Sequence, residues 1–377
     1  MAIYLDCNAT TPIEPEVAKV IHHYLLEDFG NAGSRTHELG NRAKKAVEEA
    51  RRKVASLVDC KAHEVLFTSG ATESNNIAIL GLMRSAEATE RKHIITTAIE
   101  HKAVLEPVQR LKQEGIVCTI IKPNSSGRIS PEQVLGALRK DTLLVSVMQA
   151  NNETGVLQPI EEIANALSDT DAYFHVDAAQ GFGKDIGPLR SKHIDFISIS
   201  GHKIFGPKGI GALIIKKRKD GTRVKLQPIM YGGGQEQGLR PGTLPVHLIA
   251  GLGKASEIAL RDHKERWNRC LELRTSILDA FAPMGILING SIEHALPNVI
   301  NFSVPGIDSE AAILAWKGIA EVSNGSACTS ASYDPSHVLK AMGIDEEQIE
   351  GALRLSWCHM TPDFKWDELA NSLRDLL

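Results

Sequence analysis

Two kinds of apolar pattern alternate from about residue 42 to residue 216. Stretches with apolar residues three or four positions apart predict helices, and short continuous apolar runs rich in Ile, Val and Phe predict strands. The helices are expected over 43–58, 73–83 and 104–115, and the strands over 64–70, 93–99, 142–150, 172–180, 195–201 and 211–216. Strands without a polar face, alternating with helices, are typical of a mostly parallel sheet covered on both sides. Ligands bind such a sheet beyond the C-terminal ends of its strands.

A long helical pattern then runs over 246–281, followed by a strand over 298–304 and a helix over 309–318. We interpret these elements as part of a second, smaller α/β unit, against which the first residues of the chain pack. The predicted division is a large domain of residues 16–245 and a small domain made of residues 1–15 and 246–377.

Composition narrows the class of protein. The 377 residues are 43% hydrophobic and carry a formal net charge of -4, so nothing predicts direct nucleic-acid binding. Neither a secretion signal nor a membrane span is recognised, and we expect a cytoplasmic protein with reduced thiols. The six cysteines include no CxxC pair and predict no metal site. Five are interpreted as small buried hydrophobic residues, whereas Cys328 stands among small polar residues in SNGSACTSAS.

A lysine and an aspartate stand at the ends of two predicted strands. Lys203 follows the strand over 195–201 in the segment SISGHK, where a partly desolvated amine can form a Schiff base. The alternative is a solvent-exposed lysine at a strand end. Asp177 closes the strand over 172–180 and could hold a protonated pyridine nitrogen, or could cap the next turn.

Three further segments follow strands in the same way. In FTSGATES, Ala71 and Thr72 begin a helix whose N–H groups suit a single phosphate, although such turns are also common caps. His101 could stack on an aromatic ring and move a proton, or be a structural histidine. Asn151 and Asn152 offer neutral donors and acceptors. Together these residues predict a site for a phosphorylated aromatic cofactor.

The combined motifs resemble the NifS/IscS-like cysteine desulfurases, pyridoxal-phosphate enzymes of the class V aminotransferase group. The motifs that carry the resemblance, in chain order, are YLDCNATTP, FGNAGSRTHELG, FTSGATESNN, AIEHKAV, ANNETG, HVDAAQ, SGHKIFGPKGIGAL, GGGQEQGLRPGTLP and SNGSACTSAS. The resemblance implies an α/β fold of the aspartate aminotransferase type (fold type I), with a large sheet domain and a smaller C-terminal domain. It also implies pyridoxal 5'-phosphate as the cofactor and a homodimer.

The resemblance assigns roles by position in these motifs. It implies that Lys203 holds the cofactor as a Schiff base and that Asp177 pairs with the ring nitrogen. Gln180 would lie near the ring hydroxyl, and His101 would stack on the ring. The implied phosphate contacts are Ala71, Thr72, Ser200, His202 and, from the other subunit, Thr243. The substrate carboxylate would meet Asn31, Asn152 and Arg354, and Cys328 would be the catalytic thiol. The implied reaction converts L-cysteine to L-alanine and leaves a persulfide on Cys328 for a sulfur-acceptor protein.

The chain departs from the family pattern in three places. Residues 356–360 read Ser-Trp-Cys-His-Met, where relatives often carry Ser-Leu-Gly-Arg-Phe. We interpret Cys358 and His359 as a packing change. The alternatives are that they provide a second thiol or a contact to a partner. FGNAGS stands where Asn-Pro-Ala-Ser is usual, and the C-terminal extension that some relatives use for iron–sulfur scaffold binding is lacking. The opening LDCNATTP and the short tail are similar to the desulfurase of bacterial DNA phosphorothioation (DndA-type).

Two other functions remain open from the sequence. A selenocysteine lyase or cysteine C–S lyase would use the same cofactor without needing an enzyme thiol. A degenerate paralogue that acts only as an assembly partner is disfavoured, because Lys203, Asp177, His101 and Cys328 are all retained.

Overall fold

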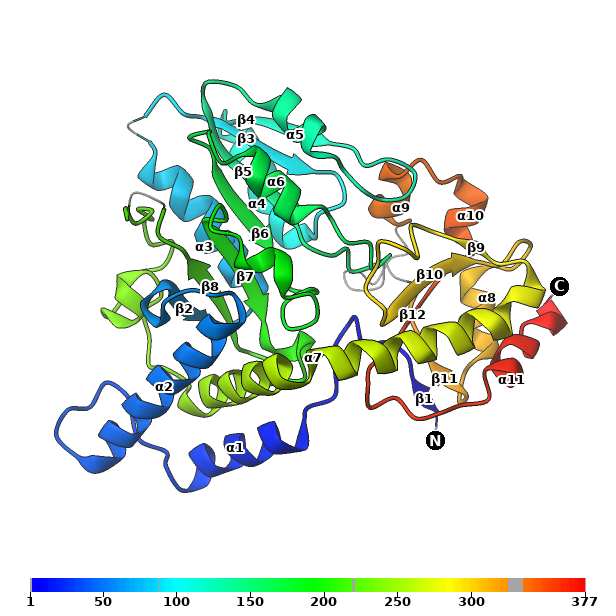
Figure 1. Cartoon of the computed structure of the whole chain (residues 1–377), viewed down its shortest axis with the longest axis horizontal. Coiled ribbons are helices and arrows are strands. Elements are labelled where there is room, and N and C mark those ends of the chain that lie inside the picture. The colour runs from blue at the N-terminus through cyan, green and yellow to red at the C-terminus, as the bar shows by residue number, and fades with distance from the viewer. Residues whose placement is uncertain (1, 88, 219–220, 325–334, 377) are drawn as a thin grey trace.

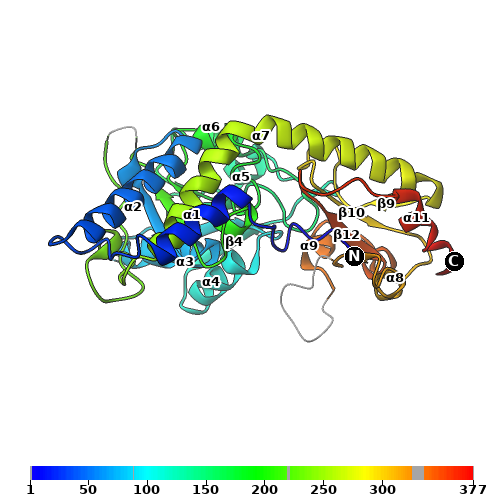
Figure 2. The same ribbon diagram turned by 90° about the horizontal axis from the view of Figure 1, so that it is seen from below.

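A single long helix joins two groups of elements. The computed structural model describes residues 2–87, 89–218, 221–324 and 335–376. Helix α7 (Val246–Phe281) has 36 residues, which at 1.5 Å per residue makes it about 54 Å long. It runs from the large sheet to the C-terminal sheets (Figures 1 and 2). The helix predicted over 246–281 is therefore confirmed.

The larger group is built on a seven-stranded sheet. Its strand order is β2-β8-β7-β6-β5-β3-β4, with the bounds β2 Val65–Thr68, β3 His93–Thr97, β4 Val117–Ile121, β5 Thr142–Met148, β6 Tyr173–Asp177, β7 Phe196–Ser200 and β8 Gly211–Ile215. Only β8 runs against its neighbours, so the predicted mostly parallel sheet is confirmed. The prediction missed β4, an edge strand whose Val117 and Ile120 are exposed and which therefore lacks a buried run.

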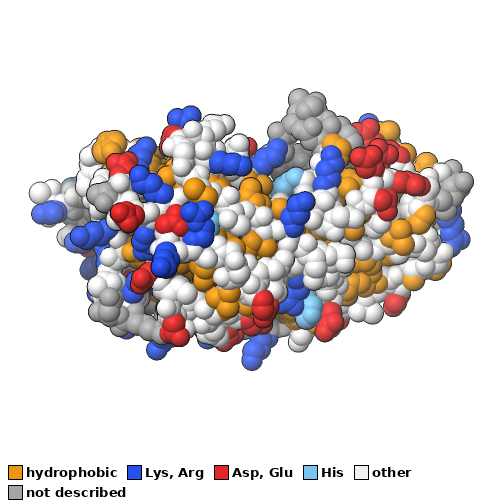
Figure 3. Space-filling view, turned by 90° about the horizontal axis from the view of Figure 1, so that it is seen from above, with side chains coloured by type: hydrophobic (Ala, Val, Ile, Leu, Met, Phe, Trp, Pro, Cys, Tyr) orange, Lys and Arg blue, Asp and Glu red, His pale blue; other side chains and the backbone are white. Residues whose placement is uncertain are grey.

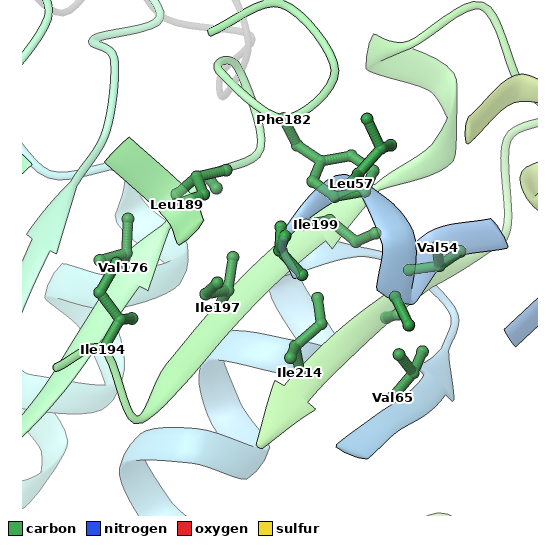
Figure 4. Packing of buried hydrophobic residues seen from close by; sticks show 14 of the residues in the cluster. Val54, Leu57, Val65, Val176, Phe182, Leu189, Ile194, Ile197, Ile199 and Ile214 are labelled. Atoms are coloured by element: carbon green, nitrogen blue, oxygen red, sulfur yellow. The ribbon is translucent and has the colours of Figure 1, made fainter. Parts of the chain in front are cut away.

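Helices cover both faces of this sheet. The helices are α1 Pro15–Leu26, α2 Glu38–Leu57, α3 Ala71–Ser85, α4 Lys102–Gln113, α5 Pro131–Ala137 and α6 Ile160–Ala166. On one face α3 and α4 pack against the strands through residues such as Leu82 and Val108. On the other face α1, α2, α5, α6 and the first half of α7 close a larger core, where Leu57 of α2 meets Phe182 and Ile199 (Figure 4). The two covered faces explain why the inner strands β5 and β7 are buried at every position.

The C-terminal elements form two small sheets. An antiparallel sheet has the order β12-β10-β9 and a two-stranded parallel sheet joins β1 to β11. The elements are β1 Ile3–Tyr4, β9 Leu287–Ile288, β10 Val299–Ser303, β11 Ala320–Glu321, β12 Ala352–Ser356, α8 Ser309–Ala315, α9 His337–Ala341, α10 Glu346–Glu350 and α11 Trp366–Asn371. Ile3 pairs with Ala320, which confirms that the first residues pack against the C-terminal part of the chain. The second half of α7 shares this core, through Leu273 and Phe281.

The exact domain boundary stays a prediction, because α7 contributes to both cores. On the face shown in Figure 3, one group of acidic side chains lies at the end that carries the C-terminal sheets, and elsewhere acidic and basic side chains are mixed. Among the described residues, no helix is both long enough and apolar enough to cross a membrane.

Candidate active site

A cavity of about 380 Å³ opens where the strands of the large sheet end. Its size falls in the range of small-molecule sites. The predicted site residues that line it are Ala71, Thr72, His101, Asn152, Asp177, Gln180, Ser200, His202, Lys203 and Arg354. They come from the first turn of α3, the loops after β3, β5, β6 and β7, and strand β12. The rule that parallel strands gather a site at their carboxyl ends thus brings together residues far apart in the sequence.

Lys203 lies in the short turn after β7 and reaches the N-terminal segment. Its Nζ donates to the backbone oxygen of Ala9 at 2.8 Å and to that of Asn8. Asn8 is buried and donates through Nδ2 to the backbone oxygen of Asn152 at 3.1 Å. The N-terminal segment is therefore one wall of the cavity. Reasoning from strand ends does not find Asn8, because it precedes the large sheet by more than fifty residues in the chain.

Asp177 ends β6 with a buried carboxylate that two donors hold. Asn75 Nδ2 donates to Oδ2 at 2.7 Å, and the amide of Ala179 donates to Oδ1 at 3.0 Å. Two donors suit an ionised carboxylate, the form that can pair with a protonated ring nitrogen. Asn75 lies on the buried face of α3, one turn inside the helix. The sequence does not predict this contact, because its phosphate-binding pattern covers only the turn and the first residues of the helix.

The first turn of α3 gives one end of the cavity the features of an anion site. Its first N–H groups have no acceptor within the helix, and the helix dipole favours a negative charge there. His202 faces the same end, and burial lowers its pKa to about 4, with Lys203 and Lys208 acting in the same direction. The His202 ring is therefore neutral at pH 7. Glu73 fixes the turn by accepting from the amide of Ser69 and from Arg240 Nε.

His101 caps the helix that follows it. Its Nδ1 accepts the amide N–H of Ala103 at 3.0 Å, which satisfies one of the free donors of α4. Burial lowers the pKa of His101, and the charge of Lys203 lowers it further, although Asp177 acts the other way. The neutral ring with an accepting Nδ1 carries its proton on Nε2. His101 is therefore a structural cap that also lines the cavity, and its stacking and proton transfer stay predictions.

Arg354 brings a cation into the cavity from strand β12. The residue is only 1% exposed, and its Nη1 and Nη2 donate to the backbone oxygen of Asn152 at 3.1 Å and to Asp6 Oδ1 at 2.6 Å. Within the part of the chain that the structure describes, its Nε has no hydrogen-bond partner. The guanidinium therefore keeps donor capacity for a carboxylate.

Three predicted site residues are not among those that line this cavity. Asn31 is exposed, and its Oδ1 accepts the amide of Gly33 at 2.8 Å. Thr243 is exposed on the loop before α7. Cys328 lies outside the described residues. Asn151, also noted in the sequence, uses its side chain to hold its own turn, through the backbone oxygen of Ile99 and the amide of Glu153.

The residues present fit pyridoxal phosphate. The cavity combines an amine, a buried carboxylate with two donors and a helix N-terminus, which are the partners that an imine carbon, a pyridine nitrogen and a phosphate require. In addition, Gln180 Oε1 is buried at this site without a hydrogen-bond partner in the described ranges. A ring hydroxyl would satisfy that oxygen.

Comparison with known proteins agrees with the geometry. The family model of the class-V aminotransferases matches residues 3–363. A relative described as cysteine desulfurase IscS, from Vibrio vulnificus (strain YJ016), is 42% identical in an alignment of 377 positions that covers 99% of this chain and 92% of that protein.

Two solved structures are similar over most of the chain. DndA from Streptomyces lividans has 50% sequence identity and a TM-score of 0.83, covering 93% of this chain and 98% of that one. SspA in complex with cysteine has 35% identity and a TM-score of 0.82, covering 94% of this chain and 98% of that one. With the family model and the curated relative, these matches support one assignment. The chain belongs to the class-V aminotransferase family, and within it to the pyridoxal-phosphate-dependent cysteine desulfurases.

Proposed function

We propose that this enzyme converts L-cysteine to L-alanine and passes the sulfur, held as a persulfide on Cys328, to an acceptor protein. The observation that carries the proposal is one cavity shared by Lys203, Asp177, His101 and Arg354. Each supplies a function that the reaction needs: an amine base, a partner for a ring nitrogen, a proton-carrying imidazole and a carboxylate receptor.

The same cavity supports a division of labour in holding the cofactor. Asp177 would pair with the ring nitrogen, Gln180 would approach the ring hydroxyl and His101 would lie against the ring. The phosphate would be held by Ala71, Thr72, Ser200 and His202, with Thr243 of a second copy. Bound pyridoxal phosphate supplies the conjugated ring that spreads the negative charge left when a substrate Cα loses its proton.

Lys203 would take up that Cα proton on Nζ. The carbonyl groups of Asn8 and Ala9, which accept from Nζ, would orient the amine. Arg354 and Asn152 would hold the substrate carboxylate, and Asn31 would join them only if its segment approaches the cavity. Because Asn152 already offers its backbone oxygen to Arg354, the two residues act as one unit.

The sulfur step follows from thiol chemistry. The thiolate of Cys328 would attack the substrate sulfur, forming an S–S bond as the substrate C–S bond breaks. The electron pair of the C–S bond stays with the three-carbon fragment, whose Cβ takes up a proton. Cα regains the proton held by Lys203, and L-alanine leaves. One thiol and one cysteine thus give one persulfide and one alanine, with no outside oxidant.

His101 would assist at the substrate sulfur through Nε2. In the tautomer that caps Ala103, Nε2 carries the proton and donates. To accept a proton from the substrate thiol instead, the ring must release the Ala103 amide and shift its own proton to Nδ1. The structure therefore favours a donating role for His101 in the resting site.

We also propose a homodimer and a dedicated sulfur acceptor. The exposed position of Thr243, outside the cavity of its own chain, supports its use in a neighbouring subunit. Among pathways, DNA phosphorothioation is supported by the similarity to DndA from Streptomyces lividans, and iron–sulfur assembly by the similarity to IscS.

Mass spectrometry after treatment with L-cysteine tests the chemistry. We expect the peptide that contains Cys328 to gain one sulfur atom, and Lys203→Ala to abolish that gain. Cys118→Ser serves as a matched control, because Cys118 lies on the edge strand β4 and does not line the cavity. Full-rate sulfide release by Cys328→Ser would instead support the lyase alternative. Purified protein that stays colourless after the cofactor is added would support a non-enzymatic role.

A further inference from the structure

A second, smaller cavity contains three thiols and a lysine. It has a volume of about 30 Å³ and lies between the N-terminal segment, the loop after β6, helix α7 and the segment after β12. Cys7, Cys270, Cys358 and Lys184 all line it. None of these side chains takes part in the proposed reaction, and among the described residues they form no three-ligand metal cluster.

Cys358 has the surroundings of a reactive thiol. It begins the turn Cys-His-Met-Thr two residues after the end of β12. Thr361 Oγ1 donates to its Sγ at 3.8 Å and accepts its amide N–H at 3.0 Å. The amides of Met360 and Thr361 also stabilise the thiolate. Hydrogen-bond donors arranged in one turn around a sulfur favour its ionised form.

Cys7 is the direct partner of this sulfur. It lines the same cavity, and its thiol is the main cause that lowers the pKa of Cys358 to about 7. The same interaction raises the pKa of Cys7, so Cys358 is the more easily ionised thiol of the two. The two residues also belong to one buried cluster with Phe205.

Lys184 supplies a charge that matches the thiolate. Its Nζ is buried and has no hydrogen-bond partner within the residues that the structure describes. Burial lowers its pKa to about 8, and negative charge on the cavity thiols raises it again. A buried amine without a hydrogen bond is costly, and a neighbouring thiolate offsets that cost.

We propose that Cys358 and Cys7 are a peroxide-sensitive pair, which hydrogen peroxide converts into a disulfide. The Cys358 thiolate attacks one peroxide oxygen and the O–O bond breaks. Hydroxide departs, and Cys358 is then a sulfenic acid. Cys7 then attacks that sulfur, the S–O bond breaks, and the thiol proton leaves with the departing oxygen as water. Two thiols and one peroxide give one disulfide and two waters.

The size of the cavity selects the oxidant. A single water needs about 10 to 15 Å³ by the same kind of measure, so about 30 Å³ admits hydrogen peroxide. A low-molecular-weight disulfide is far larger than this space. The remaining described thiols are poorer targets, because burial raises the pKa values of Cys60 and Cys270 to about 12 and also raises that of Cys118.

Oxidation of this pair would affect the active site because Cys7 is joined by one peptide bond to Asn8, a residue of the cavity wall. Cys7 precedes Asn8, whose backbone oxygen accepts from Lys203 and, at 2.9 Å, from Gln180 Nε2. A disulfide brings its two sulfurs to about 2 Å, closer than hydrogen-bonded thiols, so Cys7 or Cys358 must move. Cys7 and Asn8 are both tied to Ser356, two residues before Cys358, through its backbone oxygen and its Oγ. The disulfide therefore alters the contacts of the lysine that carries the cofactor.

The test uses full-length holoenzyme with Cys328→Ser, which removes the proposed sulfur-accepting thiol from the readout. The protein is treated with limiting hydrogen peroxide, denatured, alkylated and analysed by peptide mass spectrometry. We expect a linked peptide pair containing Cys7 and Cys358, formed about tenfold faster than oxidation of Cys60 or Cys118. The absorbance band of the bound cofactor should shift with the same time course and return after a dithiol reductant.

Two variants test the proposal further. Their readouts are labelling of a sulfenic acid and the rate of disulfide formation, neither of which depends on desulfurase activity. With Cys7→Ala, the sulfenic acid on Cys358 should persist and react with a cyclic diketone probe. With Cys118→Ala as the matched control, the disulfide should form at the original rate. The inference is wrong if Cys358 stays alkylatable while Cys60 and Cys118 oxidise, or if Cys358 pairs with Cys270.

Discussion

Asp6 and Arg354 form an ion pair at the wall of the cavity, with 2.6 Å between Oδ1 and Nη2. The arginine side chain is 1% exposed and that of the aspartate 21%. A substrate carboxylate would therefore meet a guanidinium that already has a counter-ion. Asp6 sets how much positive charge is left for the ligand, and it also holds the arginine in place when the site is empty of substrate.

Asp6→Asn should lower the free energy of unfolding and increase the stabilisation that bound L-alanine gives. The amide keeps an acceptor for Arg354 but removes the charge, so we expect a loss of about 1 to 2 kcal/mol in the free energy of unfolding. Added L-alanine should raise the melting temperature of the variant more than that of the parent, because its carboxylate replaces the missing charge. Thermal unfolding with and without L-alanine measures both effects.

Asp363→Asn is the matched control for that experiment. Asp363 pairs with Arg269 at the same distance of 2.6 Å, but its side chain is 90% exposed. We expect a change below about 0.5 kcal/mol and no added response to L-alanine. Equal losses in the two variants would show that burial of the Asp6 pair has no energetic consequence.

Asn75→Ala should loosen the cofactor without unfolding the protein. Asn75 donates to Asp177 Oδ2 at 2.7 Å, and without it the carboxylate that we propose for the ring nitrogen keeps only the Ala179 amide. A charge-assisted hydrogen bond contributes about 1.5 to 3 kcal/mol, so the cofactor should dissociate at least about tenfold more readily. Absorbance of the bound cofactor during dilution measures this. Asn76→Ala, next in the helix and bonded only to the backbone oxygen of Thr72, should behave like the parent.

The strand ends of the large sheet were predictable, because the information is local. Lys203 and Asp177 each follow an apolar run, and the geometry of parallel strands brings such positions to one edge. Six of the seven strands of this sheet and helix α7 follow from periodicity for the same reason, whereas the edge strand β4 does not.

The rest of the site depends on contacts between distant segments. Asp6 and Asn8 meet Arg354 and Lys203 only because β1 pairs with β11 and the N-terminal segment crosses the cavity. No local pattern contains that pairing. The sequence alone does not bring Cys358 together with Cys7, which shares its buried cluster but lies 351 positions away (358 − 7). The role of Asn75 could not be predicted from the sequence, because the hydrogen-bond partner of an asparagine on a helix depends on how that helix packs.

Arg51 and Glu236 provide a test of buried charge away from the cavity. Their side chains are 8% and 3% exposed, two guanidinium nitrogens donate to the carboxylate, and the amide of Phe67 donates to it as well. Glu236→Ala leaves Arg51 buried without its partner, so we expect a loss of about 3 to 5 kcal/mol in the free energy of unfolding. Glu114→Ala, which removes the exposed partner of Arg110, should cost about 0.5 kcal/mol or less. Urea denaturation compares them, and similar midpoints would contradict the expectation.

His175 should make the stability of the protein fall in mild acid. It is fully buried between Ser146 and Ser198, to whose hydroxyls its two ring nitrogens hydrogen-bond at 2.8 and 2.9 Å, and burial lowers its pKa to about 3. In the unfolded chain the histidine pKa is about 6.5. Between these two values the unfolded state binds the extra proton, so stability is lost as the pH falls from about 6.5 toward 3.

The expected loss from this residue is about 2 kcal/mol between about pH 7 and about pH 5, from roughly 1.36 kcal/mol for each pH unit below 6.5. His175→Asn should be less stable at neutral pH, because Ser198 loses its partner, but its free energy of unfolding should fall less steeply with acid. His22→Asn, at an exposed position on α1, should keep the slope of the parent. Urea denaturation at the two pH values gives the slopes, and an unchanged slope in His175→Asn would show that the buried imidazole is protonated in the folded protein.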